Sequence, residues 1–337
     1  MKKTVKIVSV FVGMVIGAGF ASGREIMEYF NFSSNSNAFG VVIASLLFSA
    51  VTYLILSKAE REKLSTYSEY ITSVAGKMAS GVRCFMLIYM FCGLFVMFSG
   101  SGALVYSLST FPKIAGVLAM ALLCFIVISF DLKGIVALNL IVVPIMILGI
   151  IYVAVCSAVF GNAMTFMPSG GRSMALSSVC YVAYNTVTAG AVLVPLAKNV
   201  TRKNIKAAAL IGGFVVGLLI TIVWTVQGMN FKALWDSELP MLELAALCGR
   251  NCKRVYSAVL FMAIYTTAVS HGFGLMSHFS DKIKNVRDRI FFSAVICLGA
   301  IPPALYGFST LVANLYSFFG YVGMAWMIWI AIDRFKD

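Results

Sequence analysis

The chain has 337 residues, of which 61% are hydrophobic and only 12% are charged, and its mean hydropathy is +0.94. Soluble domains carry about 25% charged residues, so this composition excludes a soluble globular protein and predicts one that crosses a membrane several times. The net charge of +13 would fit a nucleic-acid partner, but the positions of the basic residues argue against one.

Apolar segments recur along the whole chain, and crossing a bilayer takes about 20 such residues. The first one follows a basic start, as in a signal peptide, but no cleavage site leads into a soluble domain, so we expect it to be a membrane helix. We predict an all-α polytopic protein with a single transmembrane domain over 1–337. Its ten spans lie at about 5–30, 38–57, 82–108, 114–131, 134–160, 173–197, 204–228, 253–280, 287–305 and 309–332.

The number of basic residues alternates between high and low from one loop to the next, as a topology with ten spans requires. With the N-terminus in the cytoplasm, 19 of the 26 Lys and Arg residues fall on the inner side and 7 on the outer side. Cytoplasmic loops of membrane proteins carry such an excess. The charge therefore indicates topology, with both termini cytoplasmic, and we expect a lipid bilayer and no nucleic acid as its surroundings.

Two loops have features of their own. The inner loop over 57–81 is long enough for a short cytoplasmic helix, and the outer segment "ELPMLELAALC" is amphipathic enough to lie over the outer face as a lid. Six of the eight cysteines lie in apolar segments, where free Cys packs as a small hydrophobe. Cys248 and Cys252 lie in the polar outer loop, which would allow a disulfide if it is extracellular but offers too few ligands for a metal.

The first span combines an apolar run with glycines and charges, in "VFVGMVIGAGFASGREIMEYF" over 10–30. Gly in a helix interior costs about 1 kcal/mol relative to Ala, and this span contains four, Gly13, Gly17, Gly19 and Gly23. Close helix packing would explain glycines with GxxxG spacing. It does not explain the charges of Arg24 and Glu25, which are costly inside a membrane.

The sixth span carries polar side chains at its middle, in "YVAYNTVTAG". Such side chains are tolerated in a membrane where they face a cavity or a partner, and two interrupted spans at corresponding positions indicate the solute site of a transporter. Spans one and six are the first of five in each half of the chain. Because each half has an odd number of spans, the two halves have opposite orientations in the membrane. The sequence therefore predicts a 5+5 inverted repeat, over 5–160 and 173–332, in which broken helices 1 and 6 meet near the midplane.

The motif "GMVIGAGFASGREI" over 13–26 resembles the first helix of LeuT-fold transporters of the amino acid–polyamine–organocation superfamily, and in particular the YkvI-like group of bacterial membrane proteins. LeuT-like sodium symporters carry G-x-x-[V/I]-G-x-G in span one and A-x-x-T-[S/T] in span eight, and both patterns occur here. The resemblance implies a bacterial plasma membrane location. It also implies a sodium site made by the carbonyls of Gly13, Ile16 and Ala263 and the hydroxyls of Thr266 and Thr267.

The same break would form the solute site. Free N–H groups at the start of the outer half of span one would face an anion, and open carbonyls of span six would face an ammonium group. This pairing suits a zwitterion such as an amino acid, and it suits a polyamine less well because spans three, six, eight and ten have no acid at their middles. The residues expected at this site are Gly17, Gly19, Phe20, Ala21, Ser22, Phe95, Ser99, Tyr181, Tyr184, Asn185, Thr186 and Thr188.

Three charged or titratable residues are candidates for gating or proton coupling. Arg24 lies one residue further along than the outer-gate Arg of the family. Glu25 would carry a proton if it is desolvated, or else it pairs with Arg24 or a backbone donor. His271 would shuttle protons, or else it is hydrogen-bonded within span eight.

These observations predict a secondary active transporter, which carries an amino acid or similar zwitterion with sodium by alternating access. We expect spans one, two, six and seven to move against the rest. Proton coupling is one alternative, and a ligand-binding receptor subunit of the same fold, as in germinant receptors, is another. An enzyme is not expected, because the chain has only two histidines, few acids and no nucleophile with a base at helical spacing. No cofactor is expected beyond the coupling ion.

Overall fold

The computed structural model describes residues 2–30, 38–130, 139–160, 173–198, 200–279 and 283–334. Within these ranges every regular element is a helix. The long helices are α4 (Ala38–Arg61), α6 (Ala79–Leu108), α7 (Lys113–Ser129), α9 (Asn139–Ala158), α10 (Met174–Leu193), α11 (Arg202–Met229), α14 (Arg250–His278), α15 (Val286–Ala304) and α17 (Ser317–Arg334). The shorter helices are α1 (Lys2–Val15), α2 (Ala18–Ser22), α3 (Arg24–Tyr29), α5 (Tyr67–Ala75), α12 (Phe231–Leu234), α13 (Pro240–Leu247) and α16 (Phe308–Leu311).

Each of the ten predicted spans contains helix. In the described ranges, seven helical segments are long and apolar enough to cross a membrane. Helix α7 falls below that length with 17 residues, and α15 begins with the charged sequence "VRDR". The structure is therefore that of an all-helical, multi-span protein, and the ten-span count stays a prediction.

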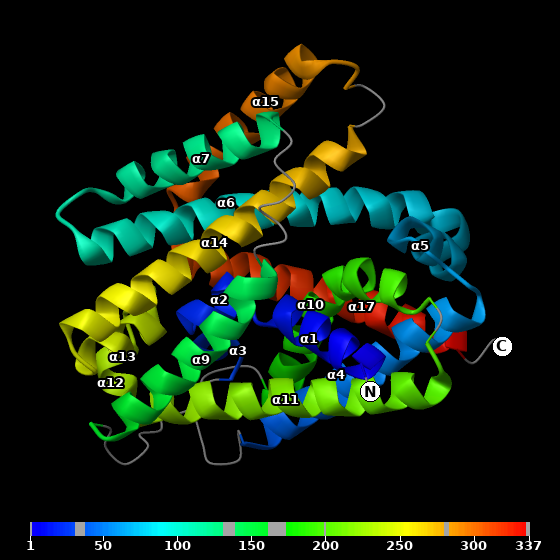
Figure 1. The fold of residues 1–337 in the computed structure, drawn as a ribbon, viewed down its shortest axis with the longest axis horizontal. Helices are drawn as coiled ribbons and strands as arrows, with labels where there is room; N and C mark the ends of the chain where they lie inside the picture. Colours follow the sequence, from blue (N-terminus) through cyan, green and yellow to red (C-terminus); the bar gives the residue numbers. More distant parts are fainter. Residues whose placement is uncertain are drawn as a thin grey trace.

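Apart from α9, which contacts both α14 and α11, the long helices together with α1 form two groups, which Figure 1 shows one above the other. Helices α6, α7, α14 and α15 pack against one another, and α1, α4, α10, α11 and α17 pack together in the second group. The short helix α2 packs on α14 of the first group, and the short helix α3 packs on α10 and α11 of the second group. The second group contains predicted spans one, two, six and seven, which are the spans expected to move together.

The predicted break in the first span is confirmed. Helix α1 ends at Val15, Gly17 has an extended backbone with φ −92° and ψ −168°, and α2 begins at Ala18. A second interruption follows at Gly23, whose φ of +80° lies in the left-handed region that favours glycine. Two of the four glycines thus stand where the backbone leaves the helix.

The predicted break in the sixth span is wrong. Helix α10 runs without interruption from Met174 to Leu193 and only then tightens into a 3₁₀ turn, Val194–Leu196. Its polar side chains bond their own helix: Asn185 Nδ2 donates to Tyr181 O at 2.9 Å and Thr186 Oγ1 to Val182 O at 2.7 Å. Such back-bonding needs no cavity, and sequence pattern alone does not separate it from a broken helix.

The inner loop contains the expected short helix, α5. Thr66 and Glu69 form a capping box at its start, which satisfies its first N–H groups. Tyr67 extends from α5 to α10, where its hydroxyl donates to Val187 O at 2.7 Å and its ring lies over Gly190. This helix therefore packs against the second half of α10.

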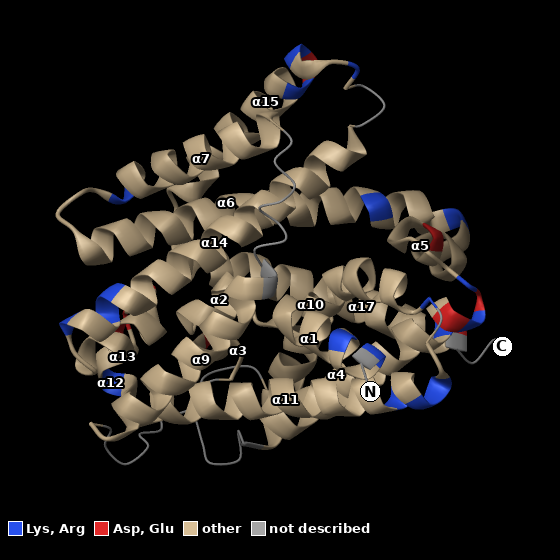
Figure 2. Ribbon diagram, in the orientation of Figure 1, with Lys and Arg blue, Asp and Glu red and all other residues tan. Residues whose placement is uncertain are grey.

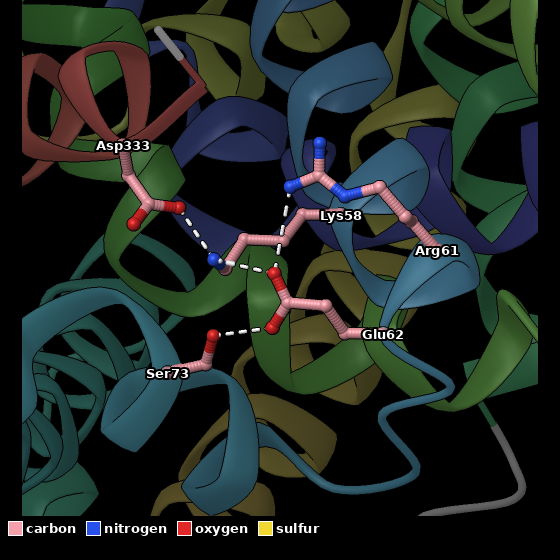
Figure 3. A network of polar contacts seen from close by, with 5 residues as sticks. All are labelled: Lys58, Arg61, Glu62, Ser73 and Asp333. Carbon is pink, nitrogen blue, oxygen red and sulfur yellow. Dashed lines mark hydrogen bonds and ion pairs between the residues drawn. The ribbon is translucent and has the colours of Figure 1, made fainter. Parts of the chain in front are cut away.

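A polar network joins α4 and α17 at the same end of the molecule (Figure 3). Lys58 Nζ lies 2.5 Å from Asp333 Oδ2 and 2.8 Å from Glu62 Oε1, and Ser73 donates to the other oxygen of Glu62. Burial opposes ionisation of Glu62, but the hydrogen bonds from Lys58 and Ser73 outweigh it and hold the pKa of this carboxyl below its ordinary value. We call Lys58, Glu62, Ser73 and Asp333 the latch network.

Charged residues gather at the ends of the long helices, and the middle of the molecule is almost free of them in the described ranges (Figure 2). Both chain ends lie on the side of α5 (Figure 1). At the opposite end, α13 packs against α2, α9 and α14, so the outer segment predicted to be a lid does cover the broken first span. Cys248 and Cys252, on either side of the α13–α14 turn, are free thiols.

Candidate functional site

The centre of the site is Glu25, in the first turn of α3. Its side chain is buried, with only 3% of the residue exposed. The carboxylate folds back over α2, where a Cβ on Gly19 would overlap Glu25 Oε1. Glycine at position 19 is therefore what leaves room for this carboxylate beside the break.

Five tyrosines form a continuous cluster with this carboxylate. Tyr184 donates its hydroxyl to Glu25 Oε1 at 3.4 Å. The ring of Tyr184 stacks on Tyr316, with centroids 4.4 Å apart, and lies 5.9 Å from Tyr89. Tyr29 lies 6.3 Å from Tyr184 and 5.3 Å from Tyr181. The Glu25–tyrosine cluster consists of Glu25, Tyr29, Tyr89, Tyr181, Tyr184 and Tyr316.

Three buried oxygen atoms of this cluster have no hydrogen-bond partner among the described residues. They are Glu25 Oε2, Tyr29 Oη and Tyr181 Oη. Buried polar atoms nearly always have a partner, and leaving one without costs about 1–3 kcal/mol. Three such atoms in one cluster are therefore available to a molecule or ion that enters it.

Arg24 does not neutralise Glu25, so the alternative in which these neighbours pair is wrong. Arg24 lies 3.8 Å from Glu28 on its own helix and donates to Ser237 O at 3.3 Å. Successive residues on a helix point in different directions, whereas residues four apart share a face. Arg24 thus links α3 to the outer loop, and Glu25 has no ion pair in the part of the chain that the structure describes.

Two residues that the sequence analysis missed fix the broken segment. Gln227, fully buried on α11, donates to Gly23 O at 2.8 Å. Tyr256 on α14 donates to Ala21 O at 2.6 Å. Carbonyls at a break lack helical partners and need others. An amide side chain in an apolar span, such as that of Gln227, could therefore have indicated in the sequence a residue that bonds the break.

Several predicted site residues have partners in their own helices, and Thr188 also interacts with Tyr89 of the cluster. Phe95 packs edge-on against Phe91 of its own helix, with centroids 5.7 Å apart. Thr188 Oγ1 bonds Asn185 O at 3.4 Å, so the polar run after Tyr184 serves α10 itself. Of the predicted solute site, Gly19, Tyr181 and Tyr184 belong to or directly contact the cluster. The remaining buried members are Phe20, Ala21, Ser22, Ser99, Asn185 and Thr186.

His271 lies at the edge of the cluster. Its Nδ1 is 2.9 Å from Thr267 O, one turn earlier on α14, and its ring centroid is 6.3 Å from that of Tyr89. The ring packs over Gly93 of α6, where a Cβ would overlap it. This hydrogen bond agrees with the second alternative for His271, a histidine that is hydrogen-bonded within span eight.

The residues of the expected sodium site come from the end of α1, the break after it and α14. Gly13 is two residues from the end of α1, and Ile16 lies just beyond it with its N–H bonded to Val12 O at 2.8 Å. On α14, Thr266 Oγ1 lies 2.9 Å from Met262 O and 3.3 Å from Ala263 O, so this hydroxyl bonds its own helix. The packing of α2 on α14 brings the break toward these residues.

The two glycines of the break allow a matched test. Gly19→Ala is expected to displace the Glu25 carboxylate and lower the midpoint of thermal unfolding, because the new Cβ would overlap Glu25 Oε1. Gly17→Ala is expected to leave that midpoint within a few degrees, because nothing lies within 4 Å of a Cβ there. Equal midpoints for the two variants in detergent would contradict the placement of Glu25.

The fold is shared with solved transporters. The inward-facing conformation of Mhp1 superimposes with a TM-score of 0.65 at 13% identity, covering 95% of this chain and 73% of that one. Mhp1 in a closed conformation, described as a nucleobase-cation-symport-1 family transporter with bromovinylhydantoin bound, gives 0.62 at 12% identity, covering 92% and 74%. The Eremococcus coleocola manganese transporter gives 0.56 at 13% identity, covering 98% and 76%. This is the LeuT-like transporter fold that the motif of the first span predicts.

No family model matches the chain. It is 30% identical over 326 residues to the uncharacterized membrane protein YkvI of Bacillus subtilis, covering 94% of this chain and 92% of that protein. It is also 22% identical over 315 residues to the uncharacterized protein YyaD of the same organism, covering 93% and 91%. The chain therefore belongs to the YkvI family of membrane proteins, which confirms the predicted group.

Proposed function

We propose that this protein is a secondary active transporter that carries an amino acid or similar small zwitterion together with sodium across the bacterial plasma membrane. The observation that carries the proposal is the break at Gly17, which lies beside a buried cluster with three unpartnered oxygen atoms. Interrupted helices supply backbone groups to solutes and ions in transporters. The open space next to Gly17 provides room at this point.

The two helix groups suggest how access would alternate. The second group, with α1, α4, α10 and α11, would rock against α6, α7, α14 and α15, while α2 and α3 contact both. At the outer end, Arg24 and its bond to Ser237 O would act as a gate. The repeats over 5–160 and 173–332 and the cytoplasmic position of both termini belong to the same proposal.

The solute is proposed to be organic rather than a metal ion. One of the similar folds belongs to a manganese transporter. In the described part of this chain, however, no group of three or more His, Cys, Asp or Glu side chains is placed to hold a metal ion. Sodium does not require such a group, because carbonyl and hydroxyl oxygens can coordinate it. Its proposed ligands are Gly13, Ile16, Ala263, Thr266 and Thr267.

Proton coupling is the second candidate, and Glu25 favours it. A buried carboxylate without a cationic partner is costly in its charged form. Glu25 has no such partner among the described residues, so a proton taken up and released by this carboxylate would supply the coupling. His271, one contact further away beside Tyr89, would be the next group on a proton path.

Uptake of labelled amino acids into proteoliposomes tests the function. We expect uptake that requires a sodium gradient, and we expect Thr267→Ala to remove the sodium dependence while the protein still folds. Thr310→Ala, at an exposed position in α16, serves as a matched control and should leave sodium dependence intact.

The other outcomes separate the alternatives. Uptake that follows a pH gradient and ignores sodium would move the coupling to Glu25 or His271. Binding without flux would indicate the receptor subunit. Sodium dependence that survives in Thr267→Ala would show that the proposed ion site is wrong.

A further inference from the structure

We propose that the Glu25–tyrosine cluster is a binding site for the ammonium group of the solute, so that a free amine is the feature this protein selects. The inference rests on the proposed transport of a small nitrogen-containing solute and adds the part of the solute that is recognised. It reverses the arrangement expected from the sequence, in which the break in span one holds an anion and span six holds the ammonium group.

The position expected to receive a solute carboxylate contains the protein's own carboxylate. Glu25 Oε1 fills the space that a side chain at Gly19 would take, directly beside the break. A second carboxylate at this point would meet a like charge in a buried setting, which is unfavourable. Helix α2 has only five residues and offers little compensation. The break therefore favours a cation.

The carbonyls expected to receive the ammonium group are not open. Helix α10 is continuous past Tyr184 and Thr188, so its backbone oxygens accept bonds from their own helix. Several accept a second bond as well, such as Val182 O from Thr186 and Val187 O from Tyr67. The sixth span thus contributes tyrosine side chains and not backbone groups.

The cluster matches the hydrogen-bonding capacity of an ammonium group. A primary ammonium has three N–H donors and no acceptor. The cluster has three buried oxygen atoms without partners, Glu25 Oε2, Tyr29 Oη and Tyr181 Oη. Glu25 supplies the negative charge that the cation requires, and no Lys or Arg of the described ranges forms an ion pair with it.

The tyrosine rings provide a second source of attraction. A cation near the face of an aromatic ring gains about 0.5–2 kcal/mol, with the larger values in desolvated sites. Tyr29 and Tyr184 lie nearly parallel, with an interplanar angle of 21°, and Tyr184 and Tyr316 do so at 22°. Ring faces beside a buried carboxylate are chemically suited to organic ammonium ions, provided that the face turned to the cation is not covered by another ring.

Propylammonium chloride and sodium propionate are matched probes, because they have the same carbon chain and opposite charges. We expect propylammonium to raise the midpoint of thermal unfolding of the full-length protein in a saturable way, and propionate at equal ionic strength to leave it unchanged. Glu25→Gln should weaken propylammonium binding at least about tenfold, as for loss of a charge-assisted contact. Glu28→Gln, one turn further along α3 and partly exposed, is the matched control and should keep the affinity within about twofold.

Tyr29→Phe and Tyr181→Phe give a second measurement if Glu25→Gln does not fold. Each removes one unpartnered hydroxyl and keeps the ring, so each should weaken propylammonium binding several-fold without loss of folding. Equal effects of propylammonium and propionate on the wild-type protein, or unchanged affinity in all three variants, would overturn the proposal.

The uptake assay separates this inference from the proposed function. Amino acid uptake that propylammonium does not inhibit, and that Glu25→Gln retains, would leave transport standing and refute the ammonium site. Propylammonium binding that Glu25→Gln abolishes, in a protein that takes up no amino acid, would support the site and refute the proposed solute.

Discussion

Gly323→Ala is expected to lower the free energy of unfolding by about 1–3 kcal/mol, the usual cost of overpacking a close contact. Gly323 on α17 lies against the backbone of α10, where a Cβ would overlap Ala183 O and lie 3.2 Å from Tyr184 N. A rigid backbone cannot give way as a flexible side chain does, so the two helices would have to separate. Unfolding in detergent, followed by helical circular dichroism against denaturant, measures this change.

The same substitution should weaken propylammonium binding. Tyr184, next to the contact, donates to Glu25 and stacks on Tyr316, which precedes α17. Moving α17 away from α10 would pull this stack apart. Gly81→Ala on α6 is the control, because Gly81 is exposed and nothing lies within 4 Å of its Cβ. Alanine should stabilise that helix by up to about 1 kcal/mol. A Gly323→Ala protein as stable as the Gly81→Ala protein would contradict the close approach.

Lys58→Ala is expected to destabilise the protein by about 1–3 kcal/mol near neutral pH. Lys58 is 8% exposed and holds both Asp333 and Glu62, so its loss leaves two partly buried carboxylates without this cation (Figure 3). Breaking a fully buried pair costs about 3–5 kcal/mol, and the partial exposure of the carboxylates reduces this. Lys77→Ala, at an exposed position on the same side of the molecule, should change stability by less than about 0.5 kcal/mol.

The latch network also predicts a dependence on pH. The pKa of Glu62 is lower in the folded protein than its ordinary value of 4.5, against the effect of burial, because Lys58 and Ser73 donate to its ionised form. A lowered folded-state pKa adds stability that is complete above the ordinary value and is lost as the pH falls through the folded value. The wild-type protein should therefore lose stability below about pH 4.5, and Lys58→Ala should lose less there. Parallel losses in both proteins would contradict the role of Glu62.

The sequence alone determined the class of protein and the location of the first break. Both depend on local properties: apolar runs of membrane length, basic residues that alternate between loops, and glycines followed by charges in one span. Gly23 marks the second interruption because its left-handed backbone favours glycine wherever the rest of the chain lies, whereas the extended backbone of Gly17 is open to other residues. A short helix in the inner loop was predicted from the length of that loop, and the structure adds the capping box of Thr66 and Glu69 at its start.

Only the tertiary structure decided what the break faces. The polar run of α10 predicted a second break, yet Asn185 and Thr186 bond the helix that carries them. A polar side chain can bond a carbonyl of its own helix or a distant partner. Local sequence does not determine which of the two it bonds. Tyr89 and Tyr316 look like ordinary packing residues in the sequence and join the cluster because α6 and the turn before α17 lie beside α10. Glu25 becomes a buried carboxylate without an ion pair in the described part of the chain because the kink at Gly23 turns it inward, toward residues as distant in sequence as Tyr184 and Tyr316, while Arg24 bonds the outer loop.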